Sequence, residues 1–432
     1  MDNQVPARIA NTLINALKGG VVPRVGLEYI TVGRAQEIAA ILRDIDMIAD
    51  GGSSFRFIVG KYGSGKSFLL QTIRNYATAR GFAVVDADLS PERRFAGTKG
   101  QGLAAYKELI QNLSTKSKPD GGALPLILEK WISGIQTSVK ACSDLEGEAF
   151  DLQVEKQIYA VAGSLEGMVN GFEFARAILL YYRAYREGDD AMKSNVIKWF
   201  RGEYVTRTEA KADLGINFIV TDENWYDFLK IFGMFLVHAG YRGLLIIVDE
   251  LVNIFKIAHT QTRQNNYEKI LTMYNDALQG RAGHIGFLLG GTPQCIEDRY
   301  KGVFSYEALR SRLASGRFAD EGTKDLLAPI IRLNMLTPEE MYVLIEKLMA
   351  MHAQLFEYEP KPAQPDLVQF LNVEYNRVGA ATHITPREII RDFIELLNLL
   401  CQHPDRTVAD VLGSGDFVVK EDTSDTFAEF EL

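Results

Sequence analysis

The sequence contains few of the residues that form disulfide frameworks, metal sites or membrane spans. It has three cysteines, Cys142, Cys295 and Cys401, and six histidines among 432 residues. The cysteines are scattered and odd in number, which argues against a disulfide framework or a zinc site and favours buried thiols in a reducing compartment. No apolar run approaches the ~18 residues of a membrane span, and no signal-peptide core follows Met1, so we expect a cytoplasmic protein without a membrane anchor.

An excess of positive charge is absent as well. The formal net charge is −9, so no global basic field attracts the chain to nucleic acid, and DNA binding would depend on a local basic patch. The hydrophobic fraction of 47% and the charged fraction of 24% are ordinary for a globular protein. The length predicts two or three structural units with a sizeable core.

A glycine-rich loop between an apolar strand and an amphipathic helix is the strongest signal that the sequence does contain. The pattern G-x-x-x-x-G-K-[ST] is matched at every fixed position by Gly60, Lys61, Tyr62, Gly63, Ser64, Gly65, Lys66 and Ser67. The apolar run Phe55–Val59 precedes this loop, and apolar residues at helical spacing follow it up to Tyr76. That strand–loop–helix setting is what a phosphate-binding loop (Walker A) requires, and a glycine-rich turn that matches by chance is the alternative.

The chemistry of the loop predicts that it binds a nucleoside triphosphate. Glycines let backbone N–H groups point inward around a phosphate, and the following helix start adds its dipole and its unpaired N–H groups. We expect Lys66 to reach the β- and γ-phosphates and the Ser67 hydroxyl to be a ligand of Mg²⁺.

A second apolar strand ends in two acidic residues. The five apolar residues from Leu244 to Val248 are followed by Asp249 and Glu250. Such a run is typical of a parallel strand buried on both faces, and ligands of open α/β sheets bind beyond the carboxyl ends of the strands. We therefore predict a Walker B pattern in which Asp249 holds Mg²⁺ and Glu250 orients and polarises the attacking water. An unrelated buried strand is the alternative.

A polar residue after a third strand is a further catalytic candidate. The strand Ile285–Leu289 leads into Gly290-Gly291-Thr292-Pro293. Thr292 could lie between the acidic pair and touch the γ-phosphate or the attacking water. An ordinary Gly-Thr-Pro turn is the alternative.

Strands and helices alternate along this part of the chain. Further strands are predicted at Phe82–Asp88 and Pro329–Leu333, and a helix is predicted over residues 264–279. The alternation predicts an α/β fold with a parallel sheet that helices cover on both faces.

An arginine-rich segment, Tyr306–Arg317, offers a residue that could act across a subunit interface. A guanidinium is permanently charged and can stabilise the charge of a γ-phosphate in a neighbouring subunit. Arg312 is the first choice for such a finger, and Arg310, Arg317 and Arg299 are the others. A solvated helix face with ordinary ion pairs is an equally good interpretation.

Arg387 is predicted to reach the nucleotide from a C-terminal helix. The run Thr385-Pro386-Arg387 reads as a helix start with a threonine cap, as do Thr337 and Pro338. A cation in the first turn opposes the helix dipole, and a nearby phosphate would compensate for it. An exposed arginine paired with a glutamate is the alternative.

Composition divides the chain into four predicted segments. Residues 1–50 hold N-terminal helices, and residues 51–335 hold the nucleotide-binding core with a helical insertion at about 100–240. Residues 336–412 read as a helical lid. Residues 413–432 form an acidic tail with interspersed phenylalanines, which either docks on a partner or folds back on its own domain.

Together these motifs resemble those of AAA+ ATPases. The resemblance rests on the phosphate loop, the Asp-Glu pair, Thr292, the Ser-Arg-Leu run with Arg312 and the Thr-Pro-Arg helix start with Arg387. It implies a P-loop NTPase core of the AAA+/ASCE type with a C-terminal helical lid, ATP and Mg²⁺ as cofactors, and active sites at the interfaces of a homo-oligomer.

A segment upstream of the loop carries a further resemblance. Val32-Gly33-Arg34, followed by Glu37, resembles the element that packs beside the adenine in the Orc/Cdc6-like and STAND-like branches. The resemblance implies that Val32 and Arg34 bind the nucleotide.

More narrowly, residues 5–410 resemble the BrxD group, the ATP-binding proteins of BREX phage-defence systems. The supporting runs are Ile30-Thr31-Val32-Gly33-Arg34, Lys61-Tyr62-Gly63-Ser64-Gly65-Lys66-Ser67, Trp199-Phe200-Arg201-Gly202-Glu203 and Thr385-Pro386-Arg387. The resemblance implies other defence-system proteins, and DNA, as partners.

Two functions of different class remain open. The first is an ATPase motor or loader that hydrolyses ATP and remodels DNA or a protein partner. The second is a nucleotide-gated switch or scaffold that hydrolyses slowly and recruits an effector. The presence of Glu250 favours hydrolysis, whereas the Asp-Glu pair and the lid disfavour a small-molecule kinase.

Overall fold

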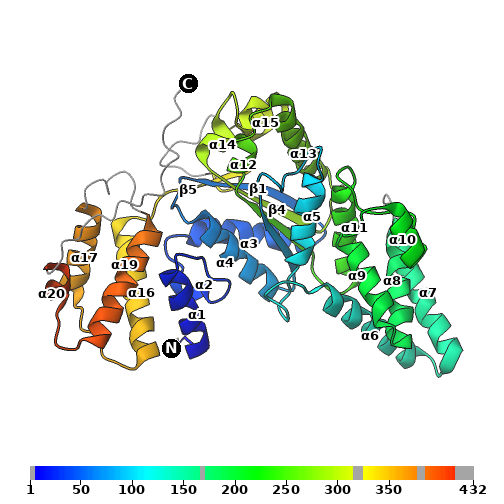
Figure 1. Cartoon of the computed structure of the whole chain (residues 1–432), viewed down its shortest axis with the longest axis horizontal. Helices are drawn as coiled ribbons and strands as arrows, with labels where there is room; N and C mark the ends of the chain where they lie inside the picture. The colour runs from blue at the N-terminus through cyan, green and yellow to red at the C-terminus, as the bar shows by residue number, and fades with distance from the viewer. Residues whose placement is uncertain (1–4, 166–170, 315–324, 377–384, 414–432) are drawn as a thin grey trace. The chain divides into compact units, whose positions relative to one another are not determined.

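A computed structural model of the chain describes residues 5–165, 171–314, 325–376 and 385–413 (Figure 1). Its contacts divide the chain into two compact units. One unit, the sheet unit, runs from Arg34 to Met335, and the other, the terminal unit, combines the residues up to Gly33 with those from Leu336 onward. The chain therefore passes from one unit to the other twice.

The sheet unit is built on five parallel strands. These are β1 (Ser53–Gly60), β2 (Ala83–Asp88), β3 (Leu244–Asp249), β4 (Ile285–Gly291) and β5 (Ile330–Leu333). Their order in the sheet is β2-β3-β4-β1-β5, and every neighbouring pair is parallel. All carboxyl ends therefore meet at one edge, and β4 separates β1 from β3.

Helices of the sheet unit lie between and around these strands. They are α3 (Ala35–Ala49), α4 (Lys66–Ala79), α5 (Gln101–Gln111), α6 (Leu124–Cys142), α7 (Gly147–Leu165), α8 (Gly171–Glu187), α9 (Asp190–Phe200), α10 (Arg207–Leu214), α11 (Trp225–His238), α12 (Val252–Phe255), α13 (Thr260–Leu278), α14 (Pro293–Glu297) and α15 (Glu307–Leu313), with a short 3₁₀ helix, η1 (Val303–Ser305).

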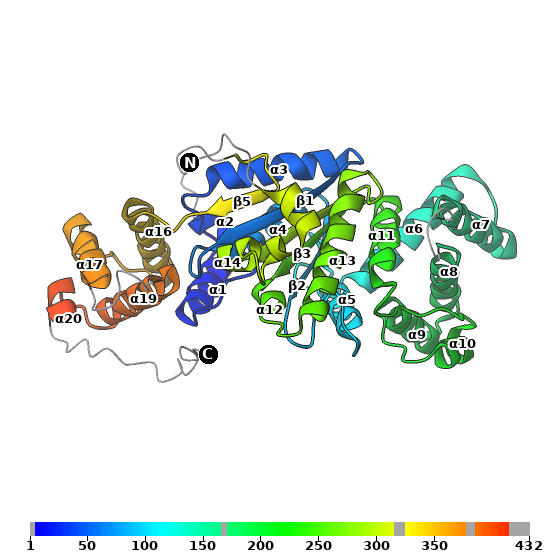
Figure 2. The same ribbon diagram turned by 90° about the horizontal axis from the view of Figure 1, so that it is seen from above.

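The strands are apolar on both faces because both faces are covered. Side chains alternate along each strand, so Leu245 and Ile247 of β3 pack in one cluster while Leu244 and Ile246 pack in the other. The first cluster includes the isoleucines of α3 and the apolar face of α4. Figure 2 shows α3 and α13 on opposite sides of the sheet.

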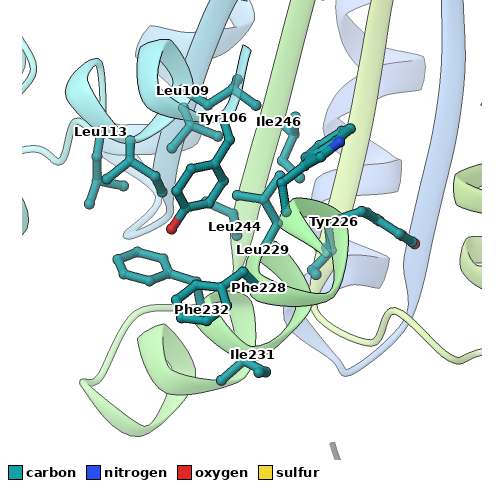
Figure 3. Packing of buried hydrophobic residues seen from close by; sticks show 14 of the residues in the cluster. Tyr106, Leu109, Leu113, Tyr226, Phe228, Leu229, Ile231, Phe232, Leu244 and Ile246 are labelled. Carbon is teal, nitrogen blue, oxygen red and sulfur yellow. The ribbon is translucent and has the colours of Figure 1, made fainter. Parts of the chain in front are cut away.

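The other face of the sheet carries a large aromatic core. Helices α5 to α11 lie between β2 and β3 in the chain, as the helical pattern at about 100–240 predicts. Figure 3 shows Tyr106 of α5 and Phe228 and Phe232 of α11 beside Leu244 and Ile246 of β3. The hydroxyl of Tyr106 donates a hydrogen bond of 2.6 Å to the carbonyl oxygen of Phe200, so this buried polar group is satisfied.

The terminal unit joins helices from both ends of the sequence. They are α1 (Ala7–Lys18), α2 (Leu27–Ile30), α16 (Pro338–Phe356), α17 (Gln364–Asn376), α19 (Pro386–Gln402) and α20 (Val408–Gly413). Helix α1 packs on α16 and α19 through a buried stripe that includes Leu13 and Leu17. The predicted caps Thr337 and Thr385 are confirmed, since each forms a capping box at the start of its helix.

The two compact units of the structure do not coincide with the predicted segments. Residues up to Gly33 pack with the C-terminal helices, whereas α3 belongs to the sheet unit, although both lie in the predicted segment 1–50. The division into functional domains stays a prediction. The expectation of buried thiols is wrong for Cys142, which is exposed where α6 ends, whereas Cys295 is buried.

The predicted mixed α/β class with a parallel sheet is confirmed. None of the helices in the described ranges is both long and apolar enough to cross a membrane. Arg317 and the tail beyond Gly413 lie outside the described residues.

Candidate functional site

The glycine-rich loop turns from β1 into α4 with two residues in the left-handed conformation. Gly63 has φ 78° and Gly65 has φ 82°. This conformation strains any other residue type, which explains the glycines there. Gly65 is the N-cap of α4 and has no side chain to cap the helix, so no N-cap side chain occupies the first N–H groups of α4. An anion fits such a helix start.

The first glycine of the loop is required by a close approach. A Cβ atom on Gly60 would lie 2.2 Å from the Ser64 hydroxyl oxygen and 3.0 Å from the carbonyl oxygen of Leu333. The Ser64 hydroxyl is itself buried and has no hydrogen-bond partner among the described residues. The loop therefore folds tightly against its own backbone and against β5.

Lys66 and the variable positions of the loop differ in exposure. Lys61 and Tyr62 are exposed, with Tyr62 72% accessible, whereas the Lys66 ammonium donates a 3.1 Å hydrogen bond to the carbonyl oxygen of Lys61. Burial lowers the pKa of Lys66 below its usual value, and the negative charges of Asp249 and Glu250 oppose this shift. The predicted phosphate ligand thus lies in the field of both predicted Walker B acids.

A hydrogen bond joins the loop to the acidic end of β3. The Ser67 hydroxyl donates to Oδ2 of Asp249 at 2.6 Å, and the backbone N–H of Glu250 donates to Oδ1 of Asp249 at 2.8 Å. Asp249 is only 8% exposed, so both carboxylate oxygens are held in place. Ser67 and Asp249 meet although β4 lies between β1 and β3, because the loop after β1 and the acidic end of β3 lie at the same edge of the sheet.

Gly290 is a site residue that the sequence analysis did not identify. A Cβ atom at this position, near the end of β4, would lie 2.2 Å from Oδ1 of Asp249. Only glycine lets β4 pass this close to the buried carboxylate. The consecutive glycines Gly290 and Gly291 were the signal that could have indicated it.

Glu250 has a backbone conformation that glutamate rarely adopts. Its φ is 61°, and it is exposed immediately after the buried Asp249. A residue other than glycine in this region costs about 1–3 kcal/mol, and such strain clusters at functional sites. The strained backbone places the Glu250 carboxylate at the solvent side of the same edge.

Asp88 brings a third carboxylate to this edge and was also missed. It ends β2 directly opposite Asp249 in the β2–β3 pairing. Burial and, after it, the neighbouring charges of Asp249 and Glu250 raise the pKa of the Asp88 carboxyl to about 6, while Arg93 opposes the shift. The acidic end of Phe82–Asp88 was visible in the sequence, but the strand order that places it beside β3 was not.

Thr292 lies where β4 leads into α14. Its hydroxyl accepts a bond from the backbone N–H of Cys295 at 3.3 Å, and its own N–H donates to the Cys295 sulfur at 3.2 Å. Burial raises the pKa of the Cys295 thiol to about 11, so this cysteine is an uncharged packing group. A hydroxyl that accepts one hydrogen bond can still donate its proton to a ligand.

Arg34 is buried against the loop. The guanidinium donates to the carbonyl oxygens of Ser64 at 3.0 Å and Asn334 at 2.7 Å, and the residue is 5% exposed. Arg34 belongs to the sheet unit, whereas Val32 and Arg387 belong to the terminal unit. That these three residues contact the nucleotide stays a prediction.

The arginines of α15 lie along their own helix. Arg312 is exposed and donates a 2.8 Å hydrogen bond to the carbonyl oxygen of Ala308, and Arg310 pairs with Glu307 at 3.6 Å. Within the described residues, no hydrogen bond or ion pair of Arg312 connects it to the loop. An arginine that acts on a neighbouring subunit would have such an outward position.

The arrangement at the sheet edge fits a triphosphate with Mg²⁺. The loop offers an uncapped helix start, a lysine and a tight glycine cradle, which suit phosphate. Ser67 and Asp249 offer two adjacent oxygen atoms. Magnesium usually takes one or two protein ligands of this kind and completes its shell with substrate phosphates and water.

Comparison with known families identifies the relationships of the chain. Among curated proteins, none matches this sequence. The model of the family described as "BREX system ATP-binding protein BrxC/D" matches residues 5–416, nearly the whole chain. The chain therefore belongs to the BrxC/D family of BREX system ATP-binding proteins.

Proposed function

We propose that the chain binds ATP with Mg²⁺ at the carboxyl edge of its sheet and hydrolyses it. The loop from Gly60 to Ser67, with Lys66, would hold the phosphates, and Ser67 with Asp249 would hold the metal ion. Bound Mg²⁺ would supply a positive charge that offsets the charge of the phosphates. The family description as ATP-binding supports the binding half of this proposal.

The observation that carries the proposal is the hydrogen bond between Ser67 and Asp249. These residues are 182 positions apart, and β1, which leads into the loop before Ser67, is not a neighbour of β3, which ends at Asp249. A glycine-rich turn or an acidic strand alone would need no such contact. Their meeting brings the two predicted magnesium ligands within 2.6 Å of each other.

Hydrolysis is the role we assign to the residues around this pair. The exposed carboxylate of Glu250, beside the metal ligand Asp249, orients the attacking water and accepts its proton. Thr292, at the end of the intervening strand, donates its hydroxyl proton to the terminal phosphate or to the water. Lys66 places its positive charge on the phosphate side of both acids.

The architecture we propose is an AAA+/ASCE core with a helical lid. The strand β4 between β1 and β3 supports the additional-strand arrangement, and the helices from α16 onward supply the lid. We assign Arg387 to the lid side of the nucleotide and Arg312 to the site of a neighbouring subunit. The active enzyme would then be a homo-oligomer that uses ATP to remodel or load DNA or a protein partner.

Membership of the BrxC/D family supports a role in phage defence. We propose that the partners are other proteins of a BREX system and that the chain corresponds to the BrxD group within the family. DNA binding is the part of the proposal with the least support from composition, because the net charge is −9.

Nucleotide binding and turnover of two variants test the proposal. Lys66→Ala should abolish binding of Mg²⁺-ATP, measured by calorimetry. Glu250→Gln should bind ATP as the wild type does and lose about 10²–10⁴-fold in turnover, the range expected for a general base. Turnover should be measured over a range of protein concentrations, because sites completed by a neighbour become more active as subunits assemble.

Two controls separate these roles from general damage. Lys61→Ala removes an exposed lysine of the same loop and should leave affinity unchanged, and Glu203→Gln removes an exposed acid between α9 and α10. Wild-type affinity in Lys66→Ala would overturn the phosphate-loop assignment. Tight binding without turnover at any concentration, with or without DNA, would favour the nucleotide-gated switch instead.

A further inference from the structure

The chain passes between its two units at two points, and one side chain lies beside both of these passages. The chain leaves the terminal unit after Gly33 and leaves the sheet unit after Met335. Arg34 is the first residue of the sheet unit, and Asn334 is its penultimate residue. Arg34 donates to the carbonyl oxygen of Asn334 at 2.7 Å, so these two segments are tied together inside the sheet unit.

The same guanidinium group also holds the phosphate loop. Nη2 of Arg34 donates to the carbonyl oxygen of Ser64 at 3.0 Å, and the neighbouring loop backbone is closed by a 3.1 Å hydrogen bond from the N–H of Ser64 to the carbonyl oxygen of Lys61. Ser64 is 1% exposed. A buried guanidinium is costly unless its donors are used, so the two carbonyl oxygens help to hold Arg34 in its buried position.

The pairing of β1 with β5 places the residues just before the second passage beside the loop as well. Gly60, the first loop residue, pairs with Leu333 at the end of β5, and Asn334 is the next residue. This ladder pairing ties the ends of β1 and β5 together. A shift of the loop therefore acts on Arg34 and on the end of β5 together.

The residues next to the two passages also lie close together in the terminal unit. Within the terminal unit, Gly33 has φ 67° and lies so close to the Glu340 carboxylate that a Cβ atom would come within 2.3 Å of Oε1. Glu340 in turn accepts the N–H of Thr337 in the capping box of α16. The segment before Arg34 is thus seated on the first turn of the helix that follows Met335.

We propose that Arg34 is a positioning residue that links the phosphate loop to the two chain segments at which the sheet unit begins and ends, so that a nucleotide in the loop makes both segments more rigid. The proposal rests on the proposed function, because it requires a nucleotide in the loop. It gives Arg34 a role through the backbone of Ser64 and Asn334. Both acceptors are backbone carbonyl oxygens, so a substitution that removes these two hydrogen bonds must be made at Arg34.

Hydrogen exchange of the full chain tests this link. Exchange is measured by mass spectrometry with and without Mg²⁺ and a non-hydrolysable ATP analogue, in peptides that cover residues 31–36 and 333–340. In the wild type the analogue should slow exchange in both segments. Each variant is measured at an analogue concentration that saturates it, and Arg34→Met should then lose this response in both segments. Arg34→Lys retains the charge without the planar fork and should show a reduced response.

Arg56 provides a matched control. It is also a buried arginine that donates to two backbone carbonyls, those of Leu327 and Ala328, but these lie ahead of β5 and away from the loop. Arg56→Met should lower the melting temperature while the response of residues 333–340 to the analogue persists. A merely structural role of Arg34 would make both variants behave alike.

The outcomes separate the two proposals. An unchanged response of both segments in Arg34→Met overturns the link, as does a wild type that binds the analogue without any response there. If Arg34→Met does not fold, a full response in Arg34→Lys overturns the link and a reduced one supports it. Absence of nucleotide binding in the wild type would instead overturn the proposed function.

Discussion

The carboxyl edge of the sheet and the aromatic core on one of its faces are organised by different rules. At the edge, single residues meet at fixed points, as Ser67 and Gly290 each do against one oxygen of the Asp249 carboxylate. In the core, the ring of Phe174 lies among four other phenylalanine rings at centroid distances of 5.0–6.0 Å. The chemistry of the edge depends on the identity of each atom there, whereas the stability of the core depends on how completely its volume is filled.

This difference predicts that the two regions respond to substitution in separable ways. A change at the edge should alter ligand binding with little effect on stability, because few apolar contacts are lost there. A change in the core should alter stability and leave the edge chemistry intact in the molecules that stay folded. The following predictions run from the largest expected effect to the smallest.

Phe174→Ala should destabilise the sheet unit by about 3–5 kcal/mol, the range for removing a fully buried phenylalanine. Phe174 is 0% exposed, whereas Phe172, on the same helix, is 58% exposed. Phe172→Ala should therefore change the free energy of unfolding by less than about 0.5 kcal/mol. Urea unfolding followed by tryptophan fluorescence measures both. Equal effects of the two variants would contradict the assigned packing.

The second half of this test measures the nucleotide affinity of Phe174→Ala at a temperature at which this variant stays folded. The affinity should match that of the wild type. A large loss of affinity at full folding would break the comparison, because it would show that the aromatic core also shapes the edge.

Gly290→Ala should weaken Mg²⁺-dependent nucleotide binding by about 10–100-fold, as is typical when a residue that orients a metal ligand is changed. The added methyl group would collide with the buried Asp249 carboxylate. Gly286→Ala, on the same strand, would instead meet the side chains of Ile48 and Leu245 in the core. It should cost about 1–3 kcal/mol of stability with unchanged affinity. Calorimetry and thermal melts of the pair measure the contrast, and a reversed pattern would contradict it.

His352 is a polar group inside a packed core. It tests whether such a group depends on its individual atomic contacts, as the residues at the edge do. It is fully buried in the terminal unit, with ring nitrogens 3.0 Å from the Tyr358 hydroxyl and 3.2 Å from Oδ1 of Asn398. Burial lowers the pKa of His352 below 6.5, although the hydrogen bond with Asn398 opposes this. The unfolded chain thus binds a proton more readily, and stability present above pH 6.5 is lost as the pH falls below it.

Hydrogen exchange in α16 peptides between pH 7 and pH 5, corrected for intrinsic rates, measures this loss. Exchange is the suitable probe because Trp131, Trp199 and Trp225 all belong to the sheet unit. His352→Gln should flatten the pH dependence, whereas His403→Gln, an exposed position after α19, should leave it as in the wild type. The same pH dependence in both variants would show that another group titrates.

Much of the fold follows from the sequence because its signals are local. Apolar runs bounded by glycine predicted β3 over 244–248, and it is found at Leu244–Asp249. The helix predicted at 264–279 is found at Thr260–Leu278. The threonine caps at Thr337 and Thr385 could be predicted because each starts a pattern of cap, proline and glutamate.

Other features could not be predicted because their partners leave no mark in the sequence. The stripe of α1 indicates an apolar partner but not that α16 and α19 supply it. The Ser64 contact of Arg34 uses a backbone carbonyl, which every residue possesses. The position of Asp88 opposite Asp249 depends on strand order, and the contact of Gly290 with Asp249 depends on the spacing of β3 and β4.

The terminal unit imposes an order of events on biosynthesis. Helix α1 leaves the ribosome well before α16 and α19, the helices on which it packs, which begin at Pro338 and Pro386. At ~5–20 residues per second, roughly 15–60 s pass before α16 emerges. During that time the apolar stripe of the nascent α1 has no native partner, so the newborn chain should be a client of chaperones that bind short amphipathic helices.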